Sequence, residues 1–464
     1  MADHRLRFET KMSEQEALMW ALEQDPVLRS SFSNVTFFDR PPDVARFRSR
    51  MERAIQVLPR LRQRVSEPAG GLSSPSWVDD SLFDLDFHVR HIAVPPPGTE
   101  DQVLQLGALL SGDAFDRARP LWQFTIVEGL EGGRGAMLQR MHHTITDGEG
   151  GIRLSAMFTD IDRDATEPLG GSSAVVAAQV EGRSAMTTVR ETVGDAVRGP
   201  LGVARRAVGQ VGHIVTDPRG GADDAVETAR SVLRQLAVTE PSHSPLWSQR
   251  SLRRHLEVLS IPLDEAKEAA HALDGTVNDL FVTGAVGGAG AYHRALGSEV
   301  DELRMAMPVS TRTDKGAGGN AFAPTRMLVP AGIVDPRERF AAVQAVLAAA
   351  KGERASGVTA QLAGLINVLP TPVITKVARQ QVGTVDFTTS NVRGAPFDLF
   401  IAGARIEANY PIGPMAGTAF NLTTMSYCGR LDMGCAIDLA AIDDPALLRQ
   451  CLVDAYDELL ALRH

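Results

Sequence analysis

The sequence predicts an α/β (α+β) fold made of two halves of similar size, each combining strands with helices. Three observations support this expectation. The chain has 464 residues, strand-like and helical patterns alternate toward both of its ends, and a stretch of different composition separates the two regions. That length, with 44% hydrophobic residues, is enough for a large buried core and favours two domains over one.

The N-terminal half is predicted to span residues 1–166. Its strand-like segments and its helical segments alternate, and the helical ones carry apolar residues at three- and four-residue steps. Strands are expected at 33–39, 87–94, 121–130 and 134–143, and helices at 42–59, 100–110 and 151–161.

Residues 167–245 are predicted to be a helical crossover linker. Gly, Ser, Ala, Val and Thr dominate this segment and aromatic residues are absent from it, as is typical of a long connection outside a main core. Within it, residues 186–215 have an amphipathic pattern. A helix packed on its own protein is the favoured interpretation, and a helix lying on a lipid surface is the alternative.

The C-terminal half is predicted to span residues 246–464. Strands are expected at 253–261, 303–309, 325–330, 385–392, 400–411 and 420–438, and helices at 263–273, 276–296, 335–355 and 444–463. No sequence repeat of 20 to 50 residues is evident, so a solenoid or a propeller is not expected.

Composition narrows the class of function. Lys and Arg number 47 against 57 Asp and Glu, a formal charge of -10, which argues against a general nucleic-acid binder. The charged N-terminus lacks a signal-like apolar core, and no run of 18 apolar residues occurs, so a cytoplasmic location is expected. Cys428, Cys435 and Cys451 lack zinc-like spacing and are expected to be free thiols.

The stretch "MHHTITDGEG" at residues 141–150 holds the strongest chemical signal. An imidazole titrates near neutral pH without help, so His143 is suited to take a proton from a hydroxyl. Asp147 would anchor the turn that follows, and Gly148 would tolerate its bend. As metal ligands, the adjacent His142 and His143 would diverge and Asp147 would leave the set incomplete, so no metal is expected.

These residues also carry a resemblance. "HHTITDG" resembles the HHxxxDG signature of the CoA-dependent acyltransferase superfamily. "RPLW" with Pro120, Leu121 and Trp122, "TVNDLFVTG", the opening "MSEQEALMWALEQDP" and the late "DFTTSNVRGAPF" resemble the bacterial wax ester synthase/diacylglycerol acyltransferase family. The resemblance implies two chloramphenicol-acetyltransferase-like domains, each a mixed sheet with flanking helices, with an active-site tunnel at their interface.

The resemblance also implies roles for the residues of the motif. His143 would be the general base, and His142 would pack against it or orient it. Asp147 would be structural and paired with an arginine, for which "LPRLRQRV" offers Arg62. "SNVRGAP" departs from the family's usual form, with Arg393 where proline is common, so the shape of that loop is not implied.

The other motif residues have plain alternatives. Trp122 is equally well a core aromatic, so it is predicted, with Pro120 and Leu121, to support the site. Asn278 and Asp279 could form the N-terminal cap of the helix at 276–296. An amide at a helix start could also donate a hydrogen bond to an oxyanion, so Asn278 is a candidate catalytic residue.

The expected reaction is transfer of a fatty acyl group from acyl-CoA to the hydroxyl of diacylglycerol or a long-chain fatty alcohol. The thioester is already activated, so no cofactor is expected. Arg250, Arg253 and Arg254, or the linker arginines, could collect the polyanionic acyl-CoA. The insoluble products favour peripheral contact with a membrane or a lipid droplet. A same-superfamily acyltransferase for a polyketide, glycolipid or amino acceptor is the alternative, and a non-catalytic lipid-binding protein is a more distant one.

Overall fold

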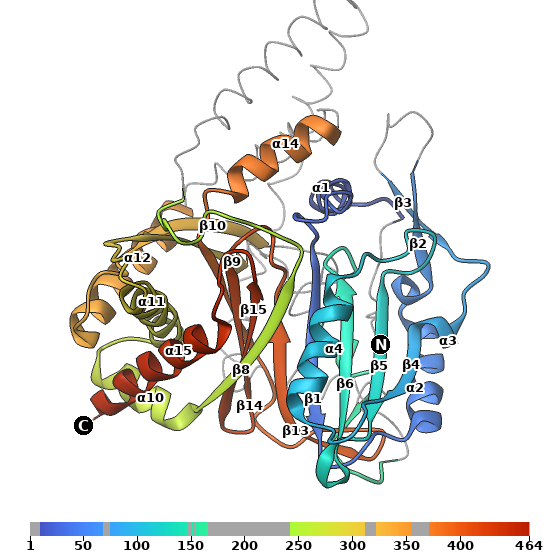
Figure 1. Ribbon diagram of the computed structural model, residues 1–464. Helices are drawn as coiled ribbons and strands as arrows, with labels where there is room; N and C mark the ends of the chain where they lie inside the picture. The colour runs from blue at the N-terminus through green and yellow to red at the C-terminus, as the bar shows by residue number, and fades with distance from the viewer. Residues whose placement is uncertain are drawn as a thin grey trace, which may run out of the picture.

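The computed structural model describes residues 10–67, 75–145, 151, 154–165, 242–310, 322–354 and 371–463. Figure 1 shows two mixed sheets side by side, with helices on the outer face of each and one helix of the N-terminal half between them. The two-half organisation that the sequence predicts is thus present in the described part of the chain.

The first sheet has seven strands in the order β4-β5-β6-β1-β13-β12-β7. Strand β1 is antiparallel to both β6 and β13, and β4 is parallel to β5. The strands from the N-terminal half are β1 (Ser31–Phe38), β4 (Val89–Ala93), β5 (Trp122–Glu128), β6 (Gly135–His142) and β7 (Thr159–Asp160). The helices of this half are α1 (Glu14–Leu22), α2 (Val44–Val57), α3 (Leu85–His88) and α4 (Glu100–Gly112), with 3-10 turns η1 (Pro59–Leu61) and η2 (Glu131–Gly133). Strands β2 (Gln63–Ser66) and β3 (Ser76–Asp79) form a separate pair.

The second sheet has six strands in the order β10-β9-β11-β14-β15-β8. They are β8 (Arg254–Pro262), β9 (Leu303–Ser310), β10 (Phe322–Val329), β11 (Phe387–Arg393), β14 (Phe420–Tyr427) and β15 (Arg430–Asp438). Its helices are α10 (Leu263–Ala272), α11 (Val277–Ala295), α12 (Pro336–Arg354), α14 (Thr371–Val382) and α15 (Pro445–Leu460), followed by η4 (Ala461–Arg463). Helix α11 is buried along most of its length, because its many Gly and Ala residues let neighbours pack closely.

Two strands from the C-terminal half complete the N-terminal sheet. They are β12 (Phe400–Ile401) and β13 (Ala404–Ile412), and β13 pairs with β1 from Ser33 opposite Ile412 to Phe38 opposite Ile406. The sequence predicts one strand over 400–411, whereas the structure breaks it at Ala402 and Gly403, which have φ values of 47° and 87°. The first sheet is therefore not built from residues 1–166 alone.

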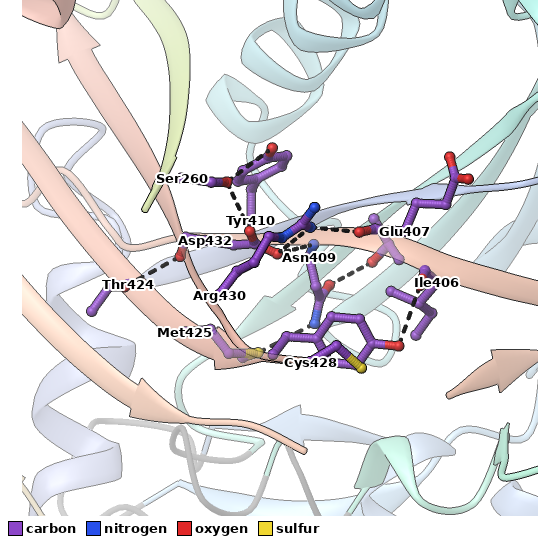
Figure 2. Close-up of polar contacts among 12 residues, drawn as sticks. Ser260, Ile406, Glu407, Asn409, Tyr410, Thr424, Met425, Cys428, Arg430 and Asp432 are labelled. Carbon is purple, nitrogen blue, oxygen red and sulfur yellow. Dashed lines mark hydrogen bonds and ion pairs between the residues drawn. The ribbon is translucent and has the colours of Figure 1, made fainter. Parts of the chain in front are cut away.

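Polar contacts fasten β13 to the second sheet (Figure 2). The backbone N–H of Asn409 donates to Asp432 Oδ2 at 2.9 Å, and Ser260 Oγ donates to the Tyr410 hydroxyl at 3.3 Å. A Cβ atom at Gly434 would lie 2.3 Å from the Pro411 carbonyl oxygen. The absence of a side chain at Gly434 thus lets the two sheets approach each other. An apolar cluster, which includes Val35, Leu104, Leu138, Leu256 and Ala436, fills the junction between α4, the first sheet and the second.

One predicted helix is partly wrong. The pattern over 151–161 predicts a helix, but its last residues form β7, where Thr159 and Asp160 pair with β12. Asp160 is fully buried in an ion pair with Arg50, which holds this segment against α2. Tertiary contacts therefore override the local helical pattern. The amphipathic segment at 186–215 lies outside the described residues.

Apart from β7, five described helices and strands have no counterpart among the predicted elements: α1, β2, β3, α3 and α14. Helix α3 includes Phe87 and His88, so the strand predicted over 87–94 begins only at Val89. Helix α1 begins with a capping box between Ser13 and Glu16, a local signal that the sequence does contain. In the described part of the chain, no helix has the length and apolarity needed to cross a membrane.

Candidate active site

The histidine pair lies at the C-terminal end of β6: His142 is the last residue of the strand, and His143 follows it. Ser31 of β1 is paired with His142, and Trp122 of β5 is paired with Met141. The His142 N–H donates to the Leu121 carbonyl at 3.0 Å, and the His143 N–H donates to the Ser30 carbonyl at 3.1 Å. The backbone of each histidine is thus anchored to a different neighbouring segment, which fixes where each side chain begins.

The side chain of His142 points into the protein and is fully buried. Its Nε2 lies 2.9 Å from Glu23 Oε2, and its Nδ1 lies 2.8 Å from Thr144 Oγ1. Both ring nitrogens are therefore occupied by protein groups, and the ring cannot reach a substrate in this arrangement.

His143 is partly exposed, and its ring lies 4.7 Å from that of Phe32, centroid to centroid. A ring that is held by its backbone, packed on one side and partly exposed can meet a ligand. Of the two histidines, His143 alone has a partly exposed side chain, and its role as general base stays a prediction. Asp147 and Gly148 lie outside the described residues, so their roles stay predictions. In the described segments, no three His, Cys, Asp or Glu side chains gather to form a metal site.

The Pro-Leu-Trp motif lies directly beside the histidines. Pro120 and Leu121 are buried, and Leu121 supplies the carbonyl that accepts from His142. Trp122 is fully buried, its ring stacks on His88 at 4.6 Å, and its Nε1 donates to the Leu61 carbonyl at 2.7 Å. The motif therefore supports the site through the backbone and the core.

Arg62 follows the Leu61 carbonyl that Trp122 binds, but its side chain turns toward β3. Its Nη2 lies 3.6 Å from Asp79 Oδ2, and both side chains are substantially exposed. Exposed ion pairs of this kind contribute little to stability. The pairing of Arg62 with Asp147 stays a prediction, since Asp147 is not among the described residues.

Asn278 and Asp279 lie in the other half, at the start of α11. Thr276 is the N-cap, and Asp279 Oδ2 accepts from the Thr276 N–H at 2.9 Å in a capping box. Asp279 thus performs the capping role that the sequence offers as the plain alternative. Asn278 Oδ1 accepts from Asn391 Nδ2 of β11 at 3.2 Å. With its oxygen engaged in this way, the amide nitrogen of Asn278 is directed away from Asn391.

A small cavity lies where the two halves meet, beside the start of β1. Its lining includes Arg29 and Ser31 from the first half and Arg254 and Leu256 from the second. Its volume of about 50 Å³ holds a few water molecules and is too small for a fatty chain. The predicted tunnel between the halves stays a prediction.

Two of the three arginines proposed to collect acyl-CoA are used inside the fold. Arg250 Nε donates to the Gly417 carbonyl at 2.6 Å, and Arg254 Nη1 lies 3.3 Å from Asp438 Oδ2. Burial lowers the pKa of both guanidinium groups. Arg253 is exposed, and it alone of the three faces solvent freely enough to meet an anionic ligand.

Sequence reasoning misses the residues behind the histidines. Glu23 lies within the segment quoted for its family resemblance, but no local pattern marks it as a partner of His142, which lies 119 residues away. Thr144 stands inside the motif at a variable position. Arg140 is buried two residues before His142, and burial, reinforced by the positive charge of Arg90, lowers its pKa to about 10.

Comparisons with known proteins agree with the motifs. The model of the wax ester synthase/diacylglycerol acyltransferase catalytic domain matches residues 12–281, and the model of the WS/DGAT C-terminal domain matches residues 318–460. The chain is 34% identical over 459 residues to a Mycobacterium tuberculosis protein named "Putative diacyglycerol O-acyltransferase", covering 98% of this chain and 93% of that protein.

Solved structures show the same fold. The wax ester synthase/diacylglycerol acyltransferase from Marinobacter aquaeolei VT8 superposes with a TM-score of 0.67 at 19% identity, covering 97% of this chain and 98% of that one. The first condensation domain of the CDA synthetase superposes with a TM-score of 0.55 at 14% identity, covering 99% and 97%. The two-domain, chloramphenicol-acetyltransferase-like fold that the resemblance implies is thus confirmed.

Proposed function

Since the chain belongs to the wax ester synthase/diacylglycerol acyltransferase family and is an acyltransferase, we propose that it acylates the hydroxyl of a lipid acceptor. The donor would be a fatty acyl-CoA, and the acceptor would be diacylglycerol, a long-chain fatty alcohol, or both. The names of its relatives favour diacylglycerol and therefore triacylglycerol synthesis. A condensation domain of the same fold has been solved in complex with C8-CoA, which supports the choice of donor.

The observation on which the mechanism rests is the difference between the surroundings of the two histidines. His142 has both ring nitrogens engaged by Thr144 and Glu23, whereas His143 is partly exposed on an anchored backbone. A general base must reach its substrate, and of the pair only His143 can do so. We assign the base to His143 on this ground.

The reaction needs no covalent enzyme intermediate. His143 removes the hydroxyl proton as the acceptor oxygen bonds to the thioester carbonyl carbon, which gives a tetrahedral oxyanion. Collapse of the oxyanion breaks the carbon–sulfur bond and releases the CoA thiolate. A free thiol has a pKa of about 8.5, so the thiolate leaves readily and takes the proton from the imidazolium of His143.

Asn278 is the proposed donor to the oxyanion. Its Oδ1 accepts from Asn391, so its amide nitrogen is the group left for a ligand. One preorganised donor is typically worth about 3 to 4 kcal/mol of transition-state stabilisation. The pair Asn278 and Asn391 would therefore act as a donor and its support.

The proposed acceptors and products are nearly insoluble in water. An enzyme that handles them gains from peripheral contact with a membrane or a lipid droplet, through surface side chains and without a spanning segment. This location is part of the proposal, and flotation of the purified protein with triolein droplets or anionic vesicles would test it.

The main test uses purified protein, palmitoyl-CoA and a panel of acceptors: dioleoylglycerol, hexadecanol, and an amine and a glycolipid for comparison. We expect release of free CoA thiol only when a lipid alcohol is present, with a matching ester product. His143→Ala should lower this rate by at least 10³-fold. Exclusive use of the amine or the glycolipid would overturn the proposed acceptor, and equal release by His143→Ala would overturn the proposed base.

A further inference from the structure

Glu23 is a buried carboxylate placed directly behind the histidine pair. It forms the C-cap of α1 and is 8% exposed. Its Oε2 accepts from the Ser30 N–H at 3.0 Å and lies 2.9 Å from His142 Nε2, whereas its Oε1 has no hydrogen-bond partner among the described residues. Burying a carboxylate costs several kcal/mol, which its contacts must offset.

The contacts of His142 determine its tautomer. The Thr144 N–H donates to His142 Nδ1 at 3.2 Å, so this nitrogen is an acceptor and carries no hydrogen. The ring hydrogen of a neutral His142 is then on Nε2, where it donates to Glu23 Oε2. Glu23 thus fixes both the tautomer and the orientation of His142.

The same carboxylate oxygen is connected to His143 through one residue. Ser30 donates its N–H to Glu23 and accepts, through its carbonyl, the N–H of His143 at 3.1 Å. Glu23 therefore holds His142 by its side chain and His143 by way of Ser30. Both attachments depend on a single atom, Oε2.

We propose that Glu23 is a positioning residue, which holds the imidazole of His143 in the geometry needed to accept the acceptor's proton. The inference rests on the proposed base role of His143. Glu23 touches no substrate in this scheme and acts only through His142 and Ser30. A displacement of about 1 Å at a reacting group can cost on the order of 10²-fold in rate, so loss of Glu23 should be felt mainly in kcat.

Three variants of Glu23 separate positioning from folding. Glu23→Gln keeps one oxygen that can accept from both Ser30 and His142, and its amide nitrogen replaces the unpartnered Oε1. Glu23→Asp keeps the charge but withdraws the oxygens by one methylene. Glu23→Ala removes the acceptor altogether. Glu16→Ala is the matched control, because Glu16 is a buried glutamate that caps the opposite end of α1.

We expect kcat for palmitoyl transfer to fall about 10²-fold in Glu23→Ala and at least tenfold in Glu23→Asp. Glu23→Gln should stay within about fivefold of wild type, and KM for both substrates should change less than twofold, since no substrate contact is lost. Glu16→Ala should lower thermal stability while keeping kcat. The ¹⁵N spectrum of histidine-labelled protein should show an Nε2-protonated His142 in wild type and in Glu23→Gln, and a changed signal in Glu23→Ala.

Wild-type kcat in both Glu23→Ala and Glu23→Asp would overturn the inference, as would a Glu23→Gln variant no better than Glu23→Asp. If Glu23→Ala does not fold, the comparison of Glu23→Gln with Glu23→Asp decides the question alone. An error in the proposed base role of His143 gives a different result, because His143→Ala would then keep the wild-type rate. An inactive His143→Ala beside wild-type kcat in both Glu23→Ala and Glu23→Asp would reject the positioning role alone.

Discussion

The indole nitrogen of Trp122 donates a hydrogen bond to the backbone carbonyl of Leu61 at 2.7 Å, and this bond is buried. The bond joins the first residue of β5 to η1, the 3-10 turn that follows α2. Because β5 pairs with β6 from Trp122 opposite Met141, this fixed point lies one residue from the histidine pair. The tryptophan of the Pro-Leu-Trp motif is thus a core residue that also ties the start of β5, the strand beside the histidine pair, to the Leu61 carbonyl.

Replacing Trp122 by Phe should therefore destabilise the fold beyond the loss of ring volume. The Leu61 carbonyl would be left buried without its donor, at a cost of about 1 to 3 kcal/mol in the free energy of unfolding. Trp247→Phe is the matched control, because Trp247 is also fully buried but its Nε1 has no acceptor among the described residues. Urea unfolding would check this, and equal losses in the two variants would contradict it.

The histidine strand shows what the sequence predicts well. The apolar pattern "RGAMLQRMHH" predicts a strand over 134–143, and β6 spans Gly135–His142. The signal is strong because the strand is central, begins with an apolar run and is followed at once by polar turn residues. The hairpin of β14 and β15 falls, for the same reason, within its predicted range of 420–438.

The parts that the sequence does not predict depend on distant partners. The local pattern at 400–411 indicates a strand but not that β13 pairs with β1, about 370 residues earlier in the chain. The partnership of Glu23 with His142 is hidden for the same reason, since a glutamate in an amphipathic helix usually faces solvent. Residue types and local periodicity identify the strand that carries the histidine pair, whereas only the folded chain shows what holds it in place.

The amide pair Asn278 and Asn391 gives a sharp test of the proposed oxyanion donor. Asn391→Asp would place a carboxylate, which only accepts, beside Asn278, so the Asn278 amide should turn its nitrogen toward it. The donor would be withdrawn, and kcat should fall about 10²-fold, as in Asn278→Ala. Asn391→Ala, which removes the support without recruiting the donor, should lose less. Steady-state kinetics would measure this order, and an Asn391→Asp enzyme faster than Asn391→Ala would contradict it.

His88 should make the stability of the protein depend on pH. It is fully buried, and its Nδ1 lies 2.7 Å from the Trp122 carbonyl, so Nδ1 carries the hydrogen. Nε2 has no partner in the described part of the chain, and burial lowers the pKa of this ring from 6.5 to about 4. In the unfolded chain His88 therefore takes up a proton as the pH falls through 6.5, whereas in the folded chain it does so only near pH 4.

The contribution of His88 is present in full above pH 6.5 and is lost as the pH falls from 6.5 toward 4, by roughly 3 kcal/mol in all. His88→Gln, which keeps a donor for the Trp122 carbonyl but does not titrate, should flatten this part of the profile. His271→Gln, at an exposed position of α10, is the control and should leave it unchanged. Urea unfolding at several pH values would measure both slopes, and a parallel profile in His88→Gln would refute the assignment.

Gly434 should be intolerant of any side chain, because it lies where β15 of the second sheet packs against β13 of the first. A Cβ atom there would lie 2.3 Å from the Pro411 carbonyl oxygen, which is backbone and cannot rotate away. Gly434→Ala should push β13 outward and lower the free energy of unfolding by about 1 to 3 kcal/mol or more. Since β13 pairs with β1, which in turn pairs with β6 up to His142, kcat should fall as well.

Gly112→Ala is the matched control for Gly434→Ala. A Cβ atom at Gly112, the last residue of α4, would meet no atom within 4 Å, and alanine favours a helix over glycine by up to about 1 kcal/mol. This variant should be neutral or slightly stabilising and should keep the wild-type kcat. Urea unfolding and palmitoyl-transfer kinetics on both variants measure stability and alignment separately. If Gly434→Ala lost stability but kept kcat, β13 would contribute to folding without setting the position of the histidines. If the variant lost neither, β13 would be able to move away from this contact at no cost.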